Sequence, residues 1–231
     1  MTTLLLIRHG QASFGTGDYD RLCERGVAQS HALGAHLRRE GRRVAAAAAG
    51  TLRRQADTAR HTLDAAGMAV PVATDPAFDE YPADGLMAAY LPLAARQDPS
   101  LAGSAAELRA DRRRFQRALM AVMALWLAGA DGFAGESWAA FRARVRAGLD
   151  AAVAGRGKDE TVAVFTSGGV IGAAVAAVLK APDDTAADLS WRVFNASVTE
   201  LHHGRRGFAL TGFNGTAHLR LAGDGDLLTH R

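Results

Sequence analysis

Three short segments of the sequence carry residues that could bind and attack an anionic group. They read Arg8-His9-Gly10, Gly50-Thr51-Leu52-Arg53-Arg54 and Thr166-Ser167-Gly168-Gly169, and each directly follows a short apolar run. Arginine offers a fork of donors to phosphate oxygens, and a helix N-terminus presents free N–H groups with a partial positive charge. Two arginines, an imidazole and glycine-flanked helix starts therefore suit a phosphate-like anion.

Each segment is weak evidence when taken alone. A histidine after a strand is more often structural than catalytic, and two arginines at a helix start are usually solvated. In an open α/β sheet, however, ligands bind outside the carboxyl ends of the strands, which is where all three segments are expected. The sequence therefore predicts one anion site that brings Arg8, His9, Arg54 and Ser167 together.

The elements that must position these residues alternate between strand and helix. Expected strands are Leu4–Ile7, the alanine-rich Val44–Ala49, an edge strand at Val70–Val72, Thr161–Phe165, and an antiparallel hairpin of Val193–Leu201 and Phe208–Phe213. Expected helices run from Leu22 to about Glu40, from Leu52 to about Ala66 and from Val170 to Leu179. This order predicts an α/β, three-layer sandwich with a mainly parallel central sheet and helices on both faces.

The middle of the chain follows a different pattern. Residues 75–103 carry four of the six prolines and show little periodicity, which predicts an irregular excursion. Residues 104–127 resemble one long helix, and Ser137 is a candidate N-cap for a helix with Trp138 and Phe141 on its buried face. We expect a single domain over residues 1–231, with an irregular and helical excursion at about 75–135.

Composition limits the classes of partner. The 27 basic and 24 acidic residues leave a net charge of only +3, and arginine pairs such as Arg38-Arg39 have no RNA-binding motif or aromatic residues beside them, so we expect no nucleic-acid partner. One cysteine, Cys23, excludes an internal disulfide. The first residues lack the features of a signal peptide, and no apolar stretch is long enough for a membrane. We expect a cytoplasmic protein without membrane contact.

The same segments carry a family resemblance. Leu6-Ile7-Arg8-His9-Gly10-Gln11 resembles the N-terminal signature of the histidine phosphatase superfamily, which is also called phosphoglycerate mutase-like. Residues 50–59 are similar to its second block, in which Arg54 aligns with the family arginine. Further similar blocks lie at 22–29, 78–81, 135–138 and 214–219, in the family's order along nearly the whole chain.

The resemblance implies a reaction in two transfers. His9 would attack the phosphorus of a phosphomonoester, and water or a second acceptor would then discharge the phosphohistidine. Arg8, Arg54, Gln11, Ser167 and Gly168 would bind the phosphoryl oxygens. Glu80 matches the family's proton donor, with Asp79 and Asp84 as nearby substitutes. The scheme requires no cofactor and no metal, and His202-His203 is expected to be a solvated turn rather than a zinc site.

Two departures from the family pattern leave alternatives open. The family's second histidine aligns with Ser167, for which His218 or His36 could substitute in space. The first loop, Gln11 to Asp18, lacks the Trp-Asn pair of glycolytic mutases, which favours a phosphatase. We therefore expect a metal-independent phosphomonoesterase that acts on a small-molecule phosphomonoester. A phosphate-ester binding or regulatory protein with weak or lost catalysis, and a mutase-like phosphoryl transferase, remain as alternatives. The substrate and a homo-oligomeric state stay open.

Overall fold

The computed structural model describes residues 1–13, 20–222 and 227–230, apart from the side chains of residues 105, 106, 109 and 112. The chain divides into two compact units, which are described separately. Unit 1 comprises Met1–Asp79 and Val145–Arg231, and unit 2 comprises Glu80–Arg144. Residues 14–19, in the loop that departs from the mutases, lie outside the described part. The single domain expected from the sequence stays a prediction.

Unit 1 is built on one sheet. Among the described residues, six strands lie in the order β3-β2-β4-β1-β5-β6. The parallel strands are β1 (Thr2–Arg8), β2 (Ala46–Ala49), β3 (Val72–Thr74) and β4 (Thr161–Thr166), and the antiparallel hairpin is β5 (Val198–Gly204) with β6 (Gly207–Gly215). The mainly parallel sheet is therefore confirmed. Its edge strand begins two residues later than expected, and β5 begins at Val198 rather than at Val193.

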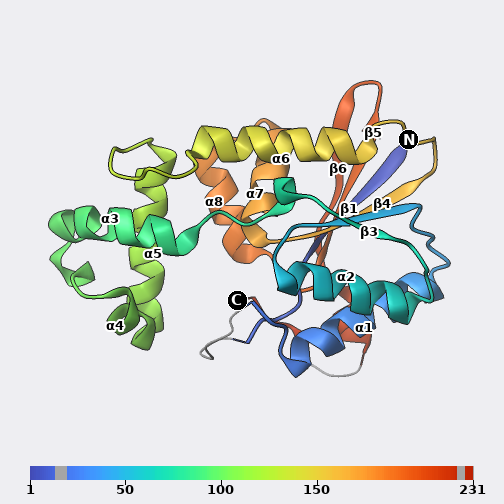
Figure 1. Ribbon diagram of the computed structural model, residues 1–231, viewed down its shortest axis with the longest axis horizontal. Helices are drawn as coiled ribbons and strands as arrows, with labels where there is room; N and C mark the ends of the chain where they lie inside the picture. The colour runs from blue at the N-terminus through green and yellow to red at the C-terminus, as the bar shows by residue number, and fades with distance from the viewer. Residues whose placement is uncertain (14–19, 223–226, 231) are drawn as a thin grey trace. The chain divides into compact units, whose positions relative to one another are not determined.

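Helices cover both faces of this sheet. On one face lie α1 (Glu24–Arg39) and α2 (Arg53–Ala66), and on the other lies α7 (Gly168–Leu179), with α8 (Asp183–Arg192) packed on α7 (Figure 1). Leu5 and Ile7 of β1 join the core under α1 and α2, whereas Leu4 and Leu6 are buried towards the opposite face because side chains alternate along a strand.

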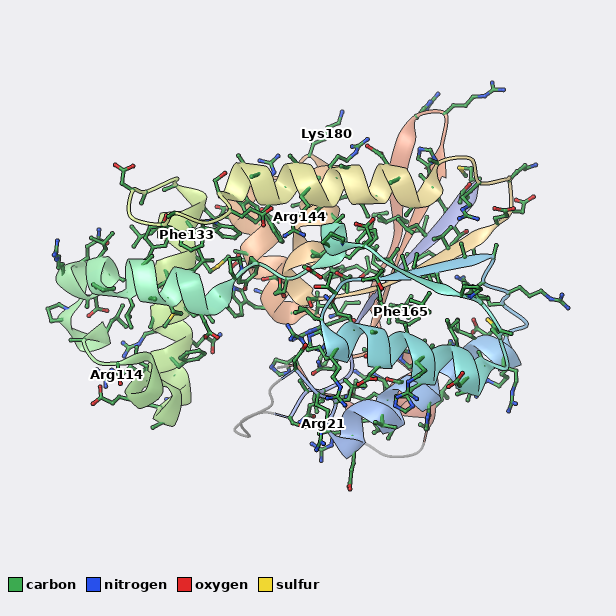
Figure 2. All side chains as sticks on the ribbon, viewed as in Figure 1. Arg21, Arg114, Phe133, Arg144, Phe165 and Lys180 are labelled. Carbon is green, nitrogen blue, oxygen red and sulfur yellow. The ribbon has the colours of Figure 1, made fainter. Side chains whose placement is uncertain are left out.

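The core of unit 1 is apolar on both sides of the sheet. Phe165 of β4 is fully buried within it, while Arg21 and Lys180 extend into solvent (Figure 2). The short elements η1 (Pro76–Phe78) and α9 (Ala217–Leu221) complete the unit. No helix in the described part of the chain is both long and apolar enough to cross a membrane.

Two glycines allow the chain after β1 to approach the start of α1. A Cβ atom on Gly10 would lie 2.5 Å from the carbonyl oxygen of Gly26, and one on Gly26 would lie 2.2 Å from the carbonyl oxygen of Gln11. Real side chains never tolerate such distances to backbone, so both positions need glycine. This contact holds the turn that carries His9 against α1.

Unit 2 corrects two expectations. A helix, α3 (Ala83–Gln97), lies where the sequence predicted irregular structure, and Pro92 lies inside it. The predicted long helix is instead a pair, α4 (Ala105–Ala110) and α5 (Arg112–Leu127), preceded by η2 (Pro99–Leu101). The break has a local cause, because the Asp111 carboxylate accepts hydrogen bonds from the N–H groups of Arg113 and Arg114 and so starts a new helix.

An aromatic cluster fills the interior of unit 2. Trp126 is 1% exposed, and its ring centroid lies 5.2 Å from that of Trp138 and 5.6 Å from that of Phe141. Trp138 and Phe141 belong to α6 (Trp138–Val153), which begins in unit 2 and continues into unit 1. The Ser137 hydroxyl accepts a hydrogen bond from the N–H of Ala140, as the expected N-cap requires. The expectation that Trp138 and Phe141 lie on the buried face of this helix is confirmed.

Candidate active site

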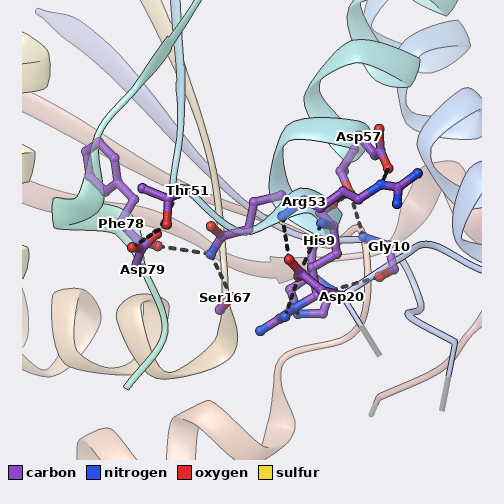
Figure 3. Close-up of polar contacts among 12 residues, drawn as sticks. His9, Gly10, Asp20, Thr51, Arg53, Asp57, Phe78, Asp79 and Ser167 are labelled. Atoms are coloured by element: carbon purple, nitrogen blue, oxygen red, sulfur yellow. Dashed lines mark hydrogen bonds and ion pairs between the residues drawn. The ribbon is translucent and has the colours of Figure 1, made fainter. Parts of the chain in front are cut away.

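His9 lies immediately after β1 and is 3% exposed. Its Nδ1 is 2.8 Å from the carbonyl oxygen of Gly10, and its Nε2 is 3.2 Å from Nε of Arg54 (Figure 3). The carbonyl oxygen can only accept and the guanidinium can only donate. The ring is therefore the neutral tautomer with its proton on Nδ1, and the lone pair on Nε2 faces Arg54.

The electrostatics of the site keep this imidazole neutral. Burial and the positive charges of Arg54 and Arg8 hold the pKa of His9 well below its ordinary value of 6.5, although the Gly10 carbonyl raises it in part. A neutral imidazole retains the lone pair that a nucleophile needs. His9 can therefore act as a nucleophile at neutral pH without a separate base to deprotonate it.

Arg54 is held by a carboxylate that the sequence did not predict. Its NH1 lies 2.7 Å from Oδ1 of Asp20, whose Oδ2 accepts a hydrogen bond of 2.8 Å from the N–H of Arg53. Asp20 thus caps the first turn of α2 and pairs with Arg54. Arg53 points away, since its half-exposed guanidinium pairs with Asp57 at 3.5 Å. The two adjacent arginines therefore differ: only Arg54 reaches His9.

Arg8 approaches the site from the last residue of β1. Its NH1 donates a hydrogen bond to the carbonyl oxygen of Val193. Its Nε would lie 3.8 Å from a Cβ atom on Gly168, the first residue of α7. The guanidinium of Arg8 therefore lies beside the N-terminus of α7, where it adds positive charge close to His9.

Ser167 and Gln55 form a buried pair. Both residues are fully buried, and Nε2 of Gln55 donates a hydrogen bond of 2.8 Å to Oγ of Ser167. The same nitrogen donates to the carbonyl oxygen of Phe78 at 3.0 Å. Ser167 precedes α7 without capping it through its side chain. The serine that replaces the family histidine is thus in contact with an amide rather than with an empty space.

Three further polar side chains fix the main chain around His9. The Thr58 hydroxyl accepts a hydrogen bond of 2.9 Å from the N–H of Gly10. Asn195 donates to the carbonyl oxygen of His9 at 3.1 Å. Gln29 accepts from the N–H of Gln11 at 2.8 Å. These contacts position Gln11 beside the site, and its role in phosphate binding stays a prediction.

The candidate acids differ in their surroundings. Asp79, the last residue of the first stretch of unit 1, accepts hydrogen bonds from the N–H (2.5 Å) and the hydroxyl (2.7 Å) of Thr51. Glu80 is the first residue of unit 2, and its Oε1 lies 3.2 Å from the N–H of Tyr81. Asp84 is exposed in the first turn of α3. The role of Glu80 as the acid stays a prediction.

The histidines considered as substitutes are engaged elsewhere. His218 is buried, its Nε2 lies 2.9 Å from the carbonyl oxygen of Ala196, and its ring centroid lies 5.7 Å from that of His36. His36 lies 3.2 Å from Glu40.

His202 lies on β5 rather than in a turn, with its Nε2 3.0 Å from Glu200. In the described part of the chain, no group of three or more His, Cys, Asp or Glu residues could hold a metal ion.

Sequence reasoning missed Asp20, Gln55 and Thr58. Two of them carried a usable signal, because Gln55 and Thr58 follow Arg54 by one and four residues in the same helix. Thr58 lies on the face of α2 that Arg54 shares, as the helical spacing dictates. Asp20 had no comparable signal, since its contact with Arg54 spans 34 residues of sequence.

Comparison with known proteins places this site in a family. A model of the histidine phosphatase superfamily (branch 1) matches residues 4–216. No match was found among curated proteins. The matched range contains all three predicted anion-binding segments.

Solved structures confirm the phosphoglycerate mutase-like α/β fold. The chain is similar to a phosphoglycerate mutase from Bacillus anthracis (19% identity, 96% of this chain and 97% of the other, TM-score 0.65). It is also similar to a phosphoserine phosphatase from Entamoeba histolytica, with 20% identity over 95% of this chain and 100% of the other and a TM-score of 0.64. A mycobacterial glucosyl-3-phosphoglycerate phosphatase in complex with VO3 is 26% identical over 93% of this chain and 99% of the other, with a TM-score of 0.64.

The buried His218 predicts a loss of stability in acid. Burial lowers the pKa of His218 from 6.5 to about 4, although the bond to Ala196 opposes the shift. The full contribution of this neutral histidine to stability is present above pH 6.5, and it is lost as the pH falls towards 4, because only the unfolded chain then binds the proton. The loss is on the order of 3 kcal/mol. Urea unfolding at pH 7.5 and 4.5 should show a smaller loss for His218→Gln than for the unmodified chain. An equal loss in both proteins would contradict this assignment.

Proposed function

Because the chain belongs to the histidine phosphatase superfamily, we propose that it is a metal-independent phosphomonoesterase that forms a phosphohistidine on His9. The observation that carries this proposal is the Nε2 lone pair of His9, which faces Arg54 while Nδ1 is anchored to Gly10. A phosphoryl group that enters between Nε2 and Arg54 meets a nucleophile on one side and a cationic donor on the other.

The reaction proceeds in two displacements. In the first, Nε2 of His9 forms a bond to phosphorus, the ester P–O bond breaks, and Glu80 gives a proton to the leaving oxygen. In the second, the oxygen of water forms a bond to phosphorus while Glu80 takes a proton from that water. The P–N bond then breaks, which returns the lone pair to Nε2 of His9, and inorganic phosphate leaves. Arg54 and Arg8 stabilise the charge on the phosphoryl oxygens in both steps.

The proposed substrate class is a small-molecule phosphomonoester. The substrates named for two of the relatives, phosphoserine and glucosyl-3-phosphoglycerate, are both phosphomonoesters of small molecules. The site described above suits the phosphoryl group of such esters, because Arg54 and Arg8 place positive charge close to His9. The proposal therefore extends to the phosphoryl group and not to the rest of the substrate.

A second function is favoured by one observation. Ser167 replaces a histidine in the family pattern and donates at most a neutral hydrogen bond, which is about half as strong as a charge-assisted one. A chain with this pocket could bind phosphate esters as a regulatory protein. Tight binding of inorganic phosphate without turnover would support that function over hydrolysis.

Replacing His9 by Ala tests the central proposal. Turnover of p-nitrophenyl phosphate in the presence of a chelator should fall to a few per cent or less, because the proposed mechanism has no other nucleophile. Unmodified protein quenched during turnover should carry an acid-labile phosphoryl group that His9→Ala lacks. Substantial activity in the variant would exclude the phosphohistidine mechanism.

The neighbouring arginines provide a matched pair of variants. Arg54→Ala should reduce kcat/KM by about 10²-fold or more, as expected for the loss of one preorganised transition-state donor. Arg53→Ala should change it less than about threefold, because surface ion pairs contribute little and Arg53 points to solvent. Equal changes in kcat/KM for the two variants would show that Arg54 does not bind the phosphoryl group.

Glu80→Gln separates acid catalysis from binding. It should slow hydrolysis of an alkyl phosphate far more than that of p-nitrophenyl phosphate, whose leaving group hardly needs a proton. The ratio of kcat values for the two substrates measures this difference. Equal slowing would reassign the acid, and Asp79→Asn and Asp84→Asn would then be compared in the same assay.

A further inference from the structure

We propose that Gln55 is a positioning residue that directs the hydroxyl proton of Ser167 onto the phosphoryl group. The two neutral side chains together then supply the hydrogen bond for which the family pattern has a histidine. The inference rests on the proposed function, since it concerns the same phosphoryl site. It assigns a role to a residue that the family signature did not single out.

The orientation of the Gln55 amide is determined by its partners. Nε2 lies 3.0 Å from the carbonyl oxygen of Phe78, which can only accept, so the nitrogen and not the oxygen faces it. The second N–H of the same nitrogen points to Oγ of Ser167 at 2.8 Å. Both amide hydrogens are therefore used, and Ser167 is the acceptor in this contact.

The proton of the Ser167 hydroxyl must go elsewhere. The Phe78 carbonyl already accepts from Gln55 and from the Thr166 hydroxyl, the latter at 2.7 Å. Within the described part of the chain, no acceptor for the Ser167 proton is found. A buried hydroxyl with its oxygen occupied by a donor is thus left to donate to a ligand.

The sheet places this hydroxyl beside the nucleophile. Arg8 of β1 is paired in register with Thr166 of β4, and the N–H of His9 donates to the Thr166 carbonyl at 2.8 Å. His9 and Ser167 are therefore the next residues of two adjacent parallel strands, which are about 4.8 Å apart. From this backbone adjacency we infer that the oxygens of a phosphoryl group on Nε2 of His9 would come within reach of the Ser167 hydroxyl. Figure 3 shows the two residues at the same end of the sheet.

Stability alone does not account for Gln55. Its Oε1 is buried and has no hydrogen-bond partner among the residues that the structure describes, which is unfavourable for a carbonyl group. The oxygen lies where a side chain at position 50 would be, since a Cβ atom on Gly50 would be 2.0 Å from it. An apolar side chain of similar shape would avoid the unpaired oxygen, so the amide is retained for what its nitrogen does.

The contact also predicts why histidine cannot simply be restored. An imidazole at position 167 places its Cγ close to the present Oγ, about 2.8 Å from Nε2 of Gln55. Unbonded carbon and nitrogen atoms need roughly 3.5 Å or more. Ser167→His alone should therefore not raise the rate, whereas Ser167→His combined with Gln55→Ala has the necessary space.

A double-mutant cycle tests the inference. Gln55→Met and Ser167→Ala should each reduce kcat/KM for p-nitrophenyl phosphate, and weaken the binding of inorganic phosphate, by about 3- to 10-fold, as expected for one neutral hydrogen bond. The double variant should lose no more than Ser167→Ala, because both changes act through one hydroxyl. Thr62→Val is the matched control: it removes another buried hydrogen bond of α2, to Ser30, and should lower the Tm without changing kcat/KM.

The pH profile distinguishes positioning from general packing. For Ser167→His with Gln55→Ala, the rate should be raised at low pH and should fall as the pH rises through the pKa of the introduced histidine. Ser167→His alone should show neither the higher rate nor this dependence on pH. Should Gln55→Met fail to fold, Gln55→Leu replaces it in the cycle.

The possible results separate the two proposals. Additive losses, or phosphate binding unaffected by Gln55→Met, would overturn the role of Gln55, and the binding measurement decides this even without turnover. Absence of turnover that depends on His9, with phosphate binding still sensitive to Gln55→Met, would overturn the phosphatase proposal and leave the role of Gln55 intact.

Discussion

The hydrogen bond between Nδ1 of His9 and the carbonyl oxygen of Gly10 determines what the site can do. Because a carbonyl oxygen only accepts, it assigns the ring proton to Nδ1 and leaves the lone pair on Nε2. The bond requires the Gly10 main chain to be fixed. The Thr58 hydroxyl and the close approach of Gly26 hold it from α2 and α1. The packing of two helices on one face of the sheet thus serves the orientation of a single imidazole.

The proposed phosphoryl site combines groups from separate elements at one edge of the sheet. β1 supplies Arg8 and leads into His9, β4 leads into Ser167, and α2 supplies Arg54 and Gln55. Asp20 joins this set by capping α2 and pairing with Arg54. The Asp20 carboxylate balances the guanidinium charge of Arg54, which would otherwise be costly to bury. An incoming dianion competes with that carboxylate for the same donor, so a phosphoryl group would have to displace Asp20 from Arg54 or share the guanidinium with it.

The sequence predicted the elements with local signals and missed those without. Strands β1 and β4 were correct, since short apolar runs determine them locally. Helix α2 was also correct, since Gly67 ends it with a left-handed cap. Helix α3 was missed because Pro92 lies in its interior and argues against a helix. The break at Asp111 depends on a capping carboxylate within a run that otherwise favours helix. The contacts of Asp20 with Arg54 and of Gln55 with Ser167 span 34 and 112 residues, and no local pattern encodes them.

The exchange of a histidine for a serine is coherent with the charges already present. Position 167 lies close to Arg8, since a Cβ atom on the next residue, Gly168, would be 3.8 Å from Nε of Arg8. Burial and the charges of Arg54 and Arg8 hold the pKa of His9 well below 6.5. The charged form of an imidazole at position 167 would be disfavoured for the same reasons. Its charge-assisted bond would then be present only when a bound anion compensates. A hydroxyl oriented by an amide gives a weaker hydrogen bond that does not titrate. In the proposed site, the pair of Gln55 and Ser167 would therefore give a weaker hydrogen bond to the phosphoryl group, from a donor whose presence does not depend on pH.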